Sequence, residues 1–427
     1  MILIEKFKHK LTGTDEKRRL TSNIFSLGVL QGASYILPLL TVPYLVRVLG
    51  PEYFGLLAFS TATIAYFILI TDYGFNLSAT RQISIHRDDK IKVNEIFSSV
   101  MMIKTALTLV SFVLMSLLVF SFEKFNQHWE VYFISFGMVI GQVLFPVWLF
   151  QGMERMKYIT YLSLSAKTFF TICVFIFVQE QSDYLMVPLL TAFGSIIAGV
   201  WSLYLVKKEF AVSFSWQPMQ TVKFQLAEGW HVFFSSMAIS LYTISATFIL
   251  GLFTNNTVVG YFAAADKIVQ AAKGLYIPVS QAIYPLIGKK IHKDKQAGLA
   301  FIKKITWWVG TGMFLISLAL FLLAEPIIHL LLGSQYEQSV LLLQIMAFLP
   351  FIIALSNIYG VQTMINLGYK QAFSRILIMA AVIGVGLSFL LVPVYEGLGT
   401  AITLLIVEVF VTVVMYLYLK FWRKIKC

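Results

Sequence analysis

Long apolar stretches alternate with short polar segments along almost the whole chain. Each stretch has roughly 20 residues, which is the length that an α-helix needs to cross a hydrocarbon core about 30 Å thick. The pattern therefore predicts an all-α integral membrane protein. We place twelve membrane-spanning helices at 23–46, 54–72, 96–120, 129–150, 158–178, 184–206, 229–252, 257–286, 304–332, 339–364, 372–392 and 397–419.

The composition agrees with a protein whose solvent is the lipid bilayer. Hydrophobic residues make up 58% of the 427 residues and charged residues only 13%, compared with about 45–50% and about 25% in soluble domains. The longest polar gaps, 73–95 and 207–228, are too short to fold as separate domains. We therefore expect no soluble catalytic or nucleotide-binding unit, and the helices themselves must carry the function.

The positive charges predict the orientation of the chain. Outside the spans, lysine and arginine lie almost entirely in alternate segments, and the opposite set of loops holds only Arg47 and Lys124. Short loops rich in these residues remain in the cytoplasm, so both termini are predicted to be cytoplasmic. The net charge of +12 then reflects topology and contact with anionic lipid head groups, and nucleic acid is not expected as a partner.

A short stretch in one half of the chain is similar to a stretch in the other half. Residues 55–60 (Gly-Leu-Leu-Ala-Phe-Ser) begin the second span, and 260–265 (Gly-Tyr-Phe-Ala-Ala-Ala) begin the eighth. Each half has six spans, so both halves enter the membrane in the same direction, as in transporters built from parallel repeats. We predict two pseudo-symmetric six-helix lobes that rock between inward-open and outward-open states. The predicted parts are an N-terminal segment (1–22), an N-lobe (23–206), a linker (207–228), a C-lobe (229–419) and a C-terminal segment (420–427).

Three lysines lie near the middle of predicted spans. They are Lys104, Lys167 and Lys267, in spans three, five and eight. A charged side chain near the bilayer centre is costly and usually faces a bundle interior or a water-filled cavity. We therefore hypothesise a cavity lined by lysines from both lobes. Its substrate would be an anion such as a phosphate or diphosphate, which several ammonium groups can hold.

Two acidic residues, Asp266 and Glu408, lie at similar depth. They are candidates for coupling transport to a proton or a cation. Asp266 shares one helix face with Gln270, because the two are four residues apart. The alternative is structural: both acids pair with neighbouring lysines, while Lys104 extends its ammonium toward the membrane surface. The sequence leaves both interpretations open.

Several motifs of enzymes and pumps are missing from the sequence. It contains no phosphate-binding loop for ATP, no His or Cys spacing typical of a metal site and no nucleophile elbow. We expect no cofactor and no metal. An integral-membrane glycosyltransferase or polymerase is the rival class, but such enzymes usually need a larger extramembrane loop than this chain has. The prediction is a secondary transporter, not an enzyme.

Five stretches of the sequence resemble those of bacterial O-antigen flippases, which are polysaccharide transporters. They are 48–55, 71–81, 148–157, 264–268 and 278–285. The resemblance extends through nearly the whole chain and implies a fold like that of the multidrug-and-toxin-extrusion superfamily, with two six-helix lobes around a cationic cavity. Because Asp72, Arg81, Asp266 and Lys267 lie in these stretches, Arg81 joins the substrate-binding candidates and Asp72 the ion-coupling candidates.

The resemblance also implies a substrate. O-antigen flippases move an undecaprenyl-diphosphate-linked oligosaccharide repeat unit from the cytoplasmic to the periplasmic leaflet of the inner membrane. An O-antigen polymerase and a chain-length regulator are the protein partners that such a role implies, beside membrane lipids. The alternative is a drug or small-cation exporter of the same superfamily. Such exporters favour acidic cavities, whereas lysines outnumber acids in the middle of these spans.

Overall fold

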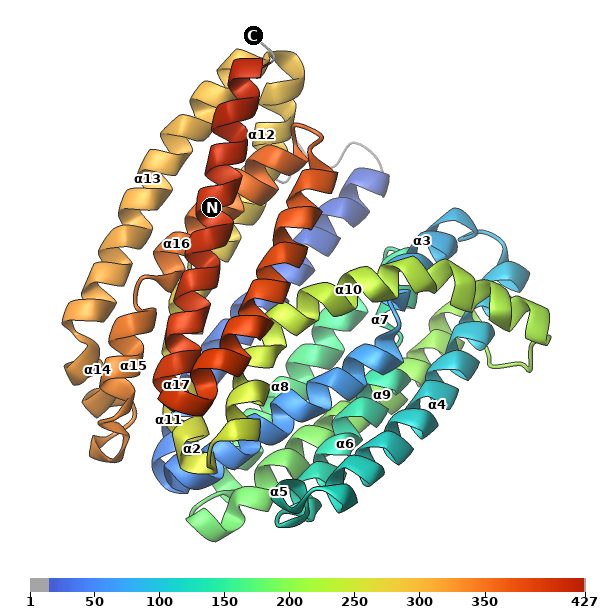
Figure 1. Ribbon diagram of the computed structural model, residues 1–427. Coiled ribbons are helices and arrows are strands. Elements are labelled where there is room, and N and C mark those ends of the chain that lie inside the picture. The colour runs from blue at the N-terminus through green and yellow to red at the C-terminus, as the bar shows by residue number, and fades with distance from the viewer. Residues whose placement is uncertain (1–14, 426–427) are drawn as a thin grey trace, which may run out of the picture. The chain divides into compact units, whose positions relative to one another are not determined.

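The protein is almost entirely helical in the computed structural model, which describes residues 15–425 (Figure 1). Side chains are described except at 15–29, 35–36, 234–236, 238–244, 282 and 422–425. Within these residues the chain forms no β-strand, so the predicted all-α class is confirmed. The predicted terminal segments lie partly outside the described residues, because 1–14 and 426–427 are not among them.

The chain divides into two compact units. The first contains the chain up to Thr41 together with Thr63–Met237, and the second contains Val42–Ala62 and the chain from Ala238 onward. The short piece Val42–Ala62 therefore packs with the second unit although both of its ends continue into the first. The predicted lobes, which are separated at 207–228, stay a prediction.

The first unit is built around the contact of two helices, α6 and α9. Gly141 of α6 packs so closely on α9 that a Cβ atom built on it would lie 2.6 Å from the Ser195 Cβ. Small residues at a helix contact allow this approach inside a membrane. The helices of this unit, besides part of α2 (Asp15–Asp72), are α3 (Phe75–Ile85), α4 (Lys90–Ser121), α5 (Glu123–Asn126), α6 (Trp129–Leu144), α7 (Val147–Gly152), α8 (Met156–Phe177), η1 (Gln181–Leu185), α9 (Met186–Phe210) and the first half of α10 (Met219–Phe253).

The second unit packs its helices around several apolar clusters, of which two are larger. One cluster gathers on α12, α13 and α16 around Ile287 and Ile302, and the other lies within α17 and against η3 around Met364 and Val411. The helices of this unit are the end of α10, α11 (Asn256–Gly274), α12 (Ile277–Lys293), α13 (Lys295–Leu322), α14 (Ala324–Leu331), η2 (Ser334–Tyr336), α15 (Ser339–Met346), α16 (Leu349–Asn357), η3 (Ile358–Ile365) and α17 (Lys370–Ile425).

Two predicted boundaries between spans coincide with breaks inside the longest helices. In α2 the break is Gly50, with φ 70° and ψ 175°, and it falls between the predicted spans 23–46 and 54–72. In α17 the break is Glu396, with φ 50° and ψ −126°, and it falls between 372–392 and 397–419. Both residues have the positive φ that glycine adopts most readily.

Four other predicted spans are divided where the sequence pattern predicts a continuous helix, and one of them, 304–332, is divided at Leu323 between α13 and α14. The span 129–150 is interrupted at Phe145, whose backbone is extended, because a residue before proline avoids the helical region. The span 257–286 is divided between α11 and α12, just before Pro278 at the start of α12. The span 339–364 is divided into α15, α16 and the π-helix η3. Apolar composition alone does not report these breaks.

Eight helices of the described chain are long and apolar enough to cross a membrane. They include the two long helices that contain the breaks at Gly50 and Glu396. The chain is therefore a multi-pass membrane protein. The count of twelve crossings stays a prediction.

Candidate functional site

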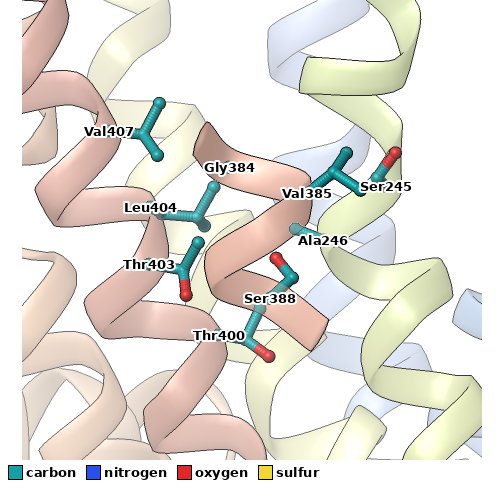
Figure 2. A pocket seen from close by; sticks show the side chains of 9 residues that line it. All are labelled: Ser245, Ala246, Gly384, Val385, Ser388, Thr400, Thr403, Leu404 and Val407. Atoms are coloured by element: carbon teal, nitrogen blue, oxygen red, sulfur yellow. The ribbon is translucent and has the colours of Figure 1, made fainter. Parts of the chain in front are cut away.

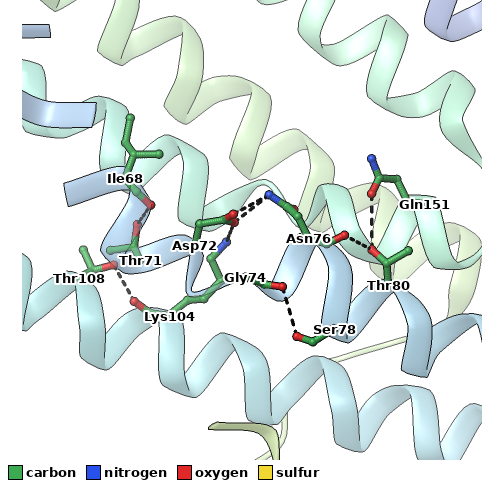
Figure 3. A network of polar contacts seen from close by, with 10 residues as sticks. All are labelled: Ile68, Thr71, Asp72, Gly74, Asn76, Ser78, Thr80, Lys104, Thr108 and Gln151. Carbon is green, nitrogen blue, oxygen red and sulfur yellow. Dashed lines mark hydrogen bonds and ion pairs between the residues drawn. The ribbon is translucent and has the colours of Figure 1, made fainter. Parts of the chain in front are cut away.

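A buried ion pair joins Asp72 and Lys104 in the first unit (Figure 3). Lys104 is only 1% exposed, and its Nζ lies 3.7 Å from a carboxylate oxygen of Asp72. The Asn76 amide donates to both oxygens of the same carboxylate, at 2.9 and 2.8 Å. An unpaired ion in such surroundings costs several kcal/mol, so the carboxylate is what allows Lys104 to lie among membrane helices.

The carboxylate is held by a tight turn between α2 and α3. Tyr73 and Gly74, which follow Asp72, both have left-handed backbone, with φ 46° and 75°. The Tyr73 ring stacks on Phe233 with 4.9 Å between centroids. Gly74 lies against Val232 of α10, where a Cβ atom would come within 2.7 Å of the valine Cγ1. The turn is therefore fixed between α10 and the ion pair.

Two of the stretches that resemble O-antigen flippases, 71–81 and 148–157, pack against each other beside this turn. The Thr80 hydroxyl donates to the backbone carbonyl of Trp148 at 3.1 Å, and the Trp148 ring is fully buried. Gly152 lies so close to α3 that a Cβ atom would come within 2.6 Å of Ile83. The stretch 148–157 therefore supports the helix α3, which carries Asn76.

Two further cations of the first unit, Lys167 and Arg81, have exposed side chains. Lys167 Nζ donates to the Ser34 hydroxyl at 2.6 Å, which connects α8 to α2. The ion pairs of the described residues do not include Lys167 or Arg81. Among the described residues, no carboxylate neutralises either charge.

The candidates of the second unit lie on α11 and α17. Lys267 is exposed and is likewise absent from the ion pairs of the described residues. Asp266 accepts a hydrogen bond from the Gln270 amide one turn further along α11, as their spacing predicts. Glu408 is half-buried on α17. Neither acid forms an ion pair with Lys267.

The second unit also contains a small cavity between α10 and α17 (Figure 2). Its volume of about 20 Å³ has room for about one water molecule. The cavity is too small for a sugar, and none of the candidate residues lines it. Four buried residues that carry hydroxyl groups line it: Ser245, Ser388, Thr400 and Thr403.

Sequence reasoning missed Asn76 and the pairing of Asp72 with Lys104. Asp72 lies at the end of a predicted span, where a charge costs little free energy. Its position therefore gave no reason to connect it with Lys104. Asn76 lies four residues after Asp72 in the stretch 71–81, but the turn between them separates two helices, so helical spacing gave no signal for this contact. Among the described residues no group of three or more His, Cys, Asp or Glu side chains is placed to hold a metal ion.

Comparison with known proteins connects these features to a family. The family described as "Polysaccharide biosynthesis protein" matches residues 20–291. The chain is 37% identical to the "Putative O-antigen transporter" of Escherichia coli (strain K12), over 96% of this chain and 99% of that protein. It is 31% identical to the protein of the same name from Shigella dysenteriae, over 92% and 98%.

Solved transporter structures share the fold. "Lipid II flippase MurJ, inward closed conformation" aligns with a TM-score of 0.69 and 13% identity, over 94% of this chain and 87% of that one. An inward-facing multidrug resistance MATE family transporter of the MOP superfamily aligns with a TM-score of 0.67 and 12% identity, over 90% and 93%. The predicted MATE-like fold is confirmed. With transporters as relatives and as structural neighbours, the chain is a multi-pass membrane transporter that belongs to the polysaccharide biosynthesis protein family.

Proposed function

We propose that this protein is a flippase for an undecaprenyl-diphosphate-linked O-antigen oligosaccharide. It would move this lipid from the cytoplasmic to the periplasmic leaflet of the bacterial inner membrane by alternating access. The names of the two curated relatives, each aligned over almost its full length, support the class of substrate. The observation that carries the proposal in the structure is the set of exposed cations without an ion pair, on helices of a transporter fold.

The cations would bind the diphosphate group. Lys167, Arg81 and Lys267 have charges that no described carboxylate neutralises. A diphosphate is the part of the substrate that attracts ammonium and guanidinium groups most strongly. The glycan would then cross the wetted interior of the transporter, while the polyprenyl tail stays in lipid.

Lys104 would contribute differently, because Asp72 already holds it. A diphosphate that approaches Lys104 competes with the Asp72 carboxylate for the same ammonium. Uptake of a proton by Asp72 would remove this competition and release Lys104 to the substrate. Asp72 is therefore our first candidate for ion coupling, ahead of Asp266 and Glu408. Differential binding of this kind is what a transporter needs in order to shift between two states.

The orientation follows from the charge distribution. Lys- and Arg-rich loops favour a cytoplasmic location of both termini, and lobes at 23–206 and 229–419 would move against each other. Membrane lipids surround the protein, and an O-antigen polymerase and a chain-length regulator are the proteins that would use its product. The drug-exporter alternative shares the fold, but the curated relatives favour the polysaccharide substrate.

Complementation of a flippase-deficient bacterial strain tests the proposal. We expect the native protein to restore polysaccharide on the cell surface, and Lys167→Ala and Lys267→Ala to reduce it strongly with unchanged amounts of protein in the membrane. Lys92→Ala is the matched control, because Lys92 pairs with Glu95 on the surface. Drug resistance without restored polysaccharide would instead identify an exporter.

A further inference from the structure

The segment that joins α9 to α10 lies in an ordered position along α4. We call residues 211–218 the linker strap; they contain no helix or strand. The backbone N–H of Ser213 donates to Asn94 Oδ1 at 2.8 Å, and that of Ser215 donates to the Ser98 hydroxyl at 3.1 Å. Asn94 and Ser98 lie one turn apart near the start of α4. The strap therefore follows the first turns of this helix.

Both ends of the linker strap are anchored in the core of the first unit. Val212, near its beginning, is 2% exposed and belongs to the main apolar cluster of the unit. Shortly after its end, the amide of the buried Gln225 donates to the Gln82 Oε1 at 2.8 Å. A segment held at both ends and along its length presents its outer side chains in fixed positions.

The outer side chains of the linker strap are two large aromatic rings. Trp216 is 82% exposed and Phe214 is 50% exposed, and their ring centroids lie 5.7 Å apart. In the sequence the two aromatic residues alternate with Ser213 and Ser215, whose backbone N–H groups donate hydrogen bonds to α4. Exposure of this much aromatic surface to water is unfavourable, so the pair requires a covering.

The end of α9 indicates the level of the membrane at which these rings lie. Exposed apolar side chains follow one another along α9 at helical spacing, including Phe193, Ile197 and Val200. This lipid-facing stripe ends at Tyr204, over whose ring the Lys208 ammonium lies at 5.8 Å. Tyrosine with a nearby lysine is typical of the boundary between hydrocarbon and head groups. The linker strap begins at residue 211, three residues after Lys208.

We infer that Phe214 and Trp216 insert into the phospholipid head-group layer of the cytoplasmic leaflet. The linker strap would thereby fix the connection between the predicted lobes at the membrane surface. Two observations favour lipid over a protein partner. The rings follow the lipid-facing stripe of α9 in the sequence, and lysines flank them on both sides, at Lys207, Lys208 and Lys223, with Glu209 as the one acid between Lys207 and Lys223. The inference does not depend on which substrate is transported.

Site-directed fluorescence in nanodiscs tests the inference. The full-length protein would carry Trp216→Cys, labelled with bimane, in a background with Cys173→Ser and Cys427→Ser. The quenchers are iodide in water and phospholipids that carry a nitroxide either near the head group or deep in the acyl chain. Asp88→Cys is the matched control, since Asp88 is exposed in the polar loop between α3 and α4.

We expect the shallow nitroxide to quench the label at position 216 several-fold more than at position 88, and iodide to show the reverse order. Phe214→Cys should behave like Trp216→Cys, so one variant that fails to fold does not prevent the test. Equal iodide quenching at positions 216 and 88 would overturn the inference. Stronger quenching by the deep nitroxide would also overturn it, as would protection that appears in native membranes but not in nanodiscs, which indicates a protein partner.

Discussion

Gly55 and Gly260 lie in backbone contact within the second unit. A Cβ atom on Gly55 would overlap the carbonyl oxygen of Asn256, and one on Gly260 would overlap the carbonyl oxygen of Pro51. The same two glycines begin the repeated motifs in the two halves of the chain. The predicted repeat therefore begins at the two residues where α2 and α11 cross.

Polar contacts fix the same piece of chain a few residues earlier. The Arg47 guanidinium donates to the carbonyl of Leu330, and the Gln335 amide donates to the carbonyls of Val46 and Arg47 at 3.3 and 3.1 Å. These bonds and the glycine crossing explain why Val42–Ala62 groups with the second unit. The chain on either side of this piece belongs to the first unit, so this piece connects the two.

A methyl group at the crossing should destabilise the protein. Gly55→Ala and Gly260→Ala force backbone atoms apart, and overpacking of this kind costs about 1–3 kcal/mol. We expect a lower melting temperature of the purified protein in detergent. Gly312→Ala is the control, because no atom lies within 4 Å of its Cβ position. An unchanged melting temperature for both crossing variants would contradict this packing.

Removing one partner of the Asp72–Lys104 pair should be more harmful than removing both. Asp72→Ala or Lys104→Met alone leaves a buried charge, which costs about 3–5 kcal/mol, whereas the double variant leaves none. We expect the singles to lose folded protein and the double variant to regain it without regaining transport. The measurement compares the amount of folded protein with surface polysaccharide. Transport by the double variant would show that the pair is only structural.

Lys167 should be required for transport but not for folding. Its side chain is exposed, and its hydrogen bond to Ser34, which involves a charged group, contributes about 1.5–3 kcal/mol at most. Ser34→Ala removes this bond and keeps the charge, so we expect transport to persist in that variant. Lys167→Ala removes the charge and should stop transport. Surface polysaccharide and melting temperature are measured for both variants. The same amount of surface polysaccharide with Ser34→Ala and with Lys167→Ala would contradict an anion-binding role of Lys167.

Glu396 should be replaceable by glycine with a gain in stability. Its backbone, with φ 50° and ψ −126°, belongs to a region that side chains make unfavourable, at a cost of roughly 1–3 kcal/mol. We expect Glu396→Gly to raise the melting temperature. Glu130→Gly in α6 is the control and should not, because Glu130 is in regular helix. A lower melting temperature for Glu396→Gly would indicate that the glutamate side chain has a role at the break.

The sequence predicted the all-α membrane class and the breaks inside the two longest helices because both depend on local composition. A polar gap with Gly50 and Pro51, and another with Glu396 and Gly397, interrupt long apolar runs. The division of the span 257–286 was not placed, although Lys273, Gly274 and Pro278 lie at it, because one or two polar residues do not end an apolar run in a hydropathy pattern.

The candidate cations were predictable because a charge in an apolar run stands out. Their partners were not. Asp72 and Lys104 come from different helices and are brought together by the turn at Tyr73 and Gly74. That turn depends on packing against Val232 and Phe233, far away in the sequence. Pairings that depend on tertiary contacts cannot be read from hydropathy and spacing.

The most direct test of the account is flipping by the purified protein in proteoliposomes that contain a fluorescent undecaprenyl-diphosphate-linked oligosaccharide. Loss of fluorescence to a membrane-impermeant quencher reports how fast the lipid reaches the outer leaflet. The account predicts acceleration by the native protein and by Lys92→Ala, and none by Lys167→Ala or Lys267→Ala. No acceleration by the native protein, or equal acceleration by all four, would contradict transport through these cationic side chains.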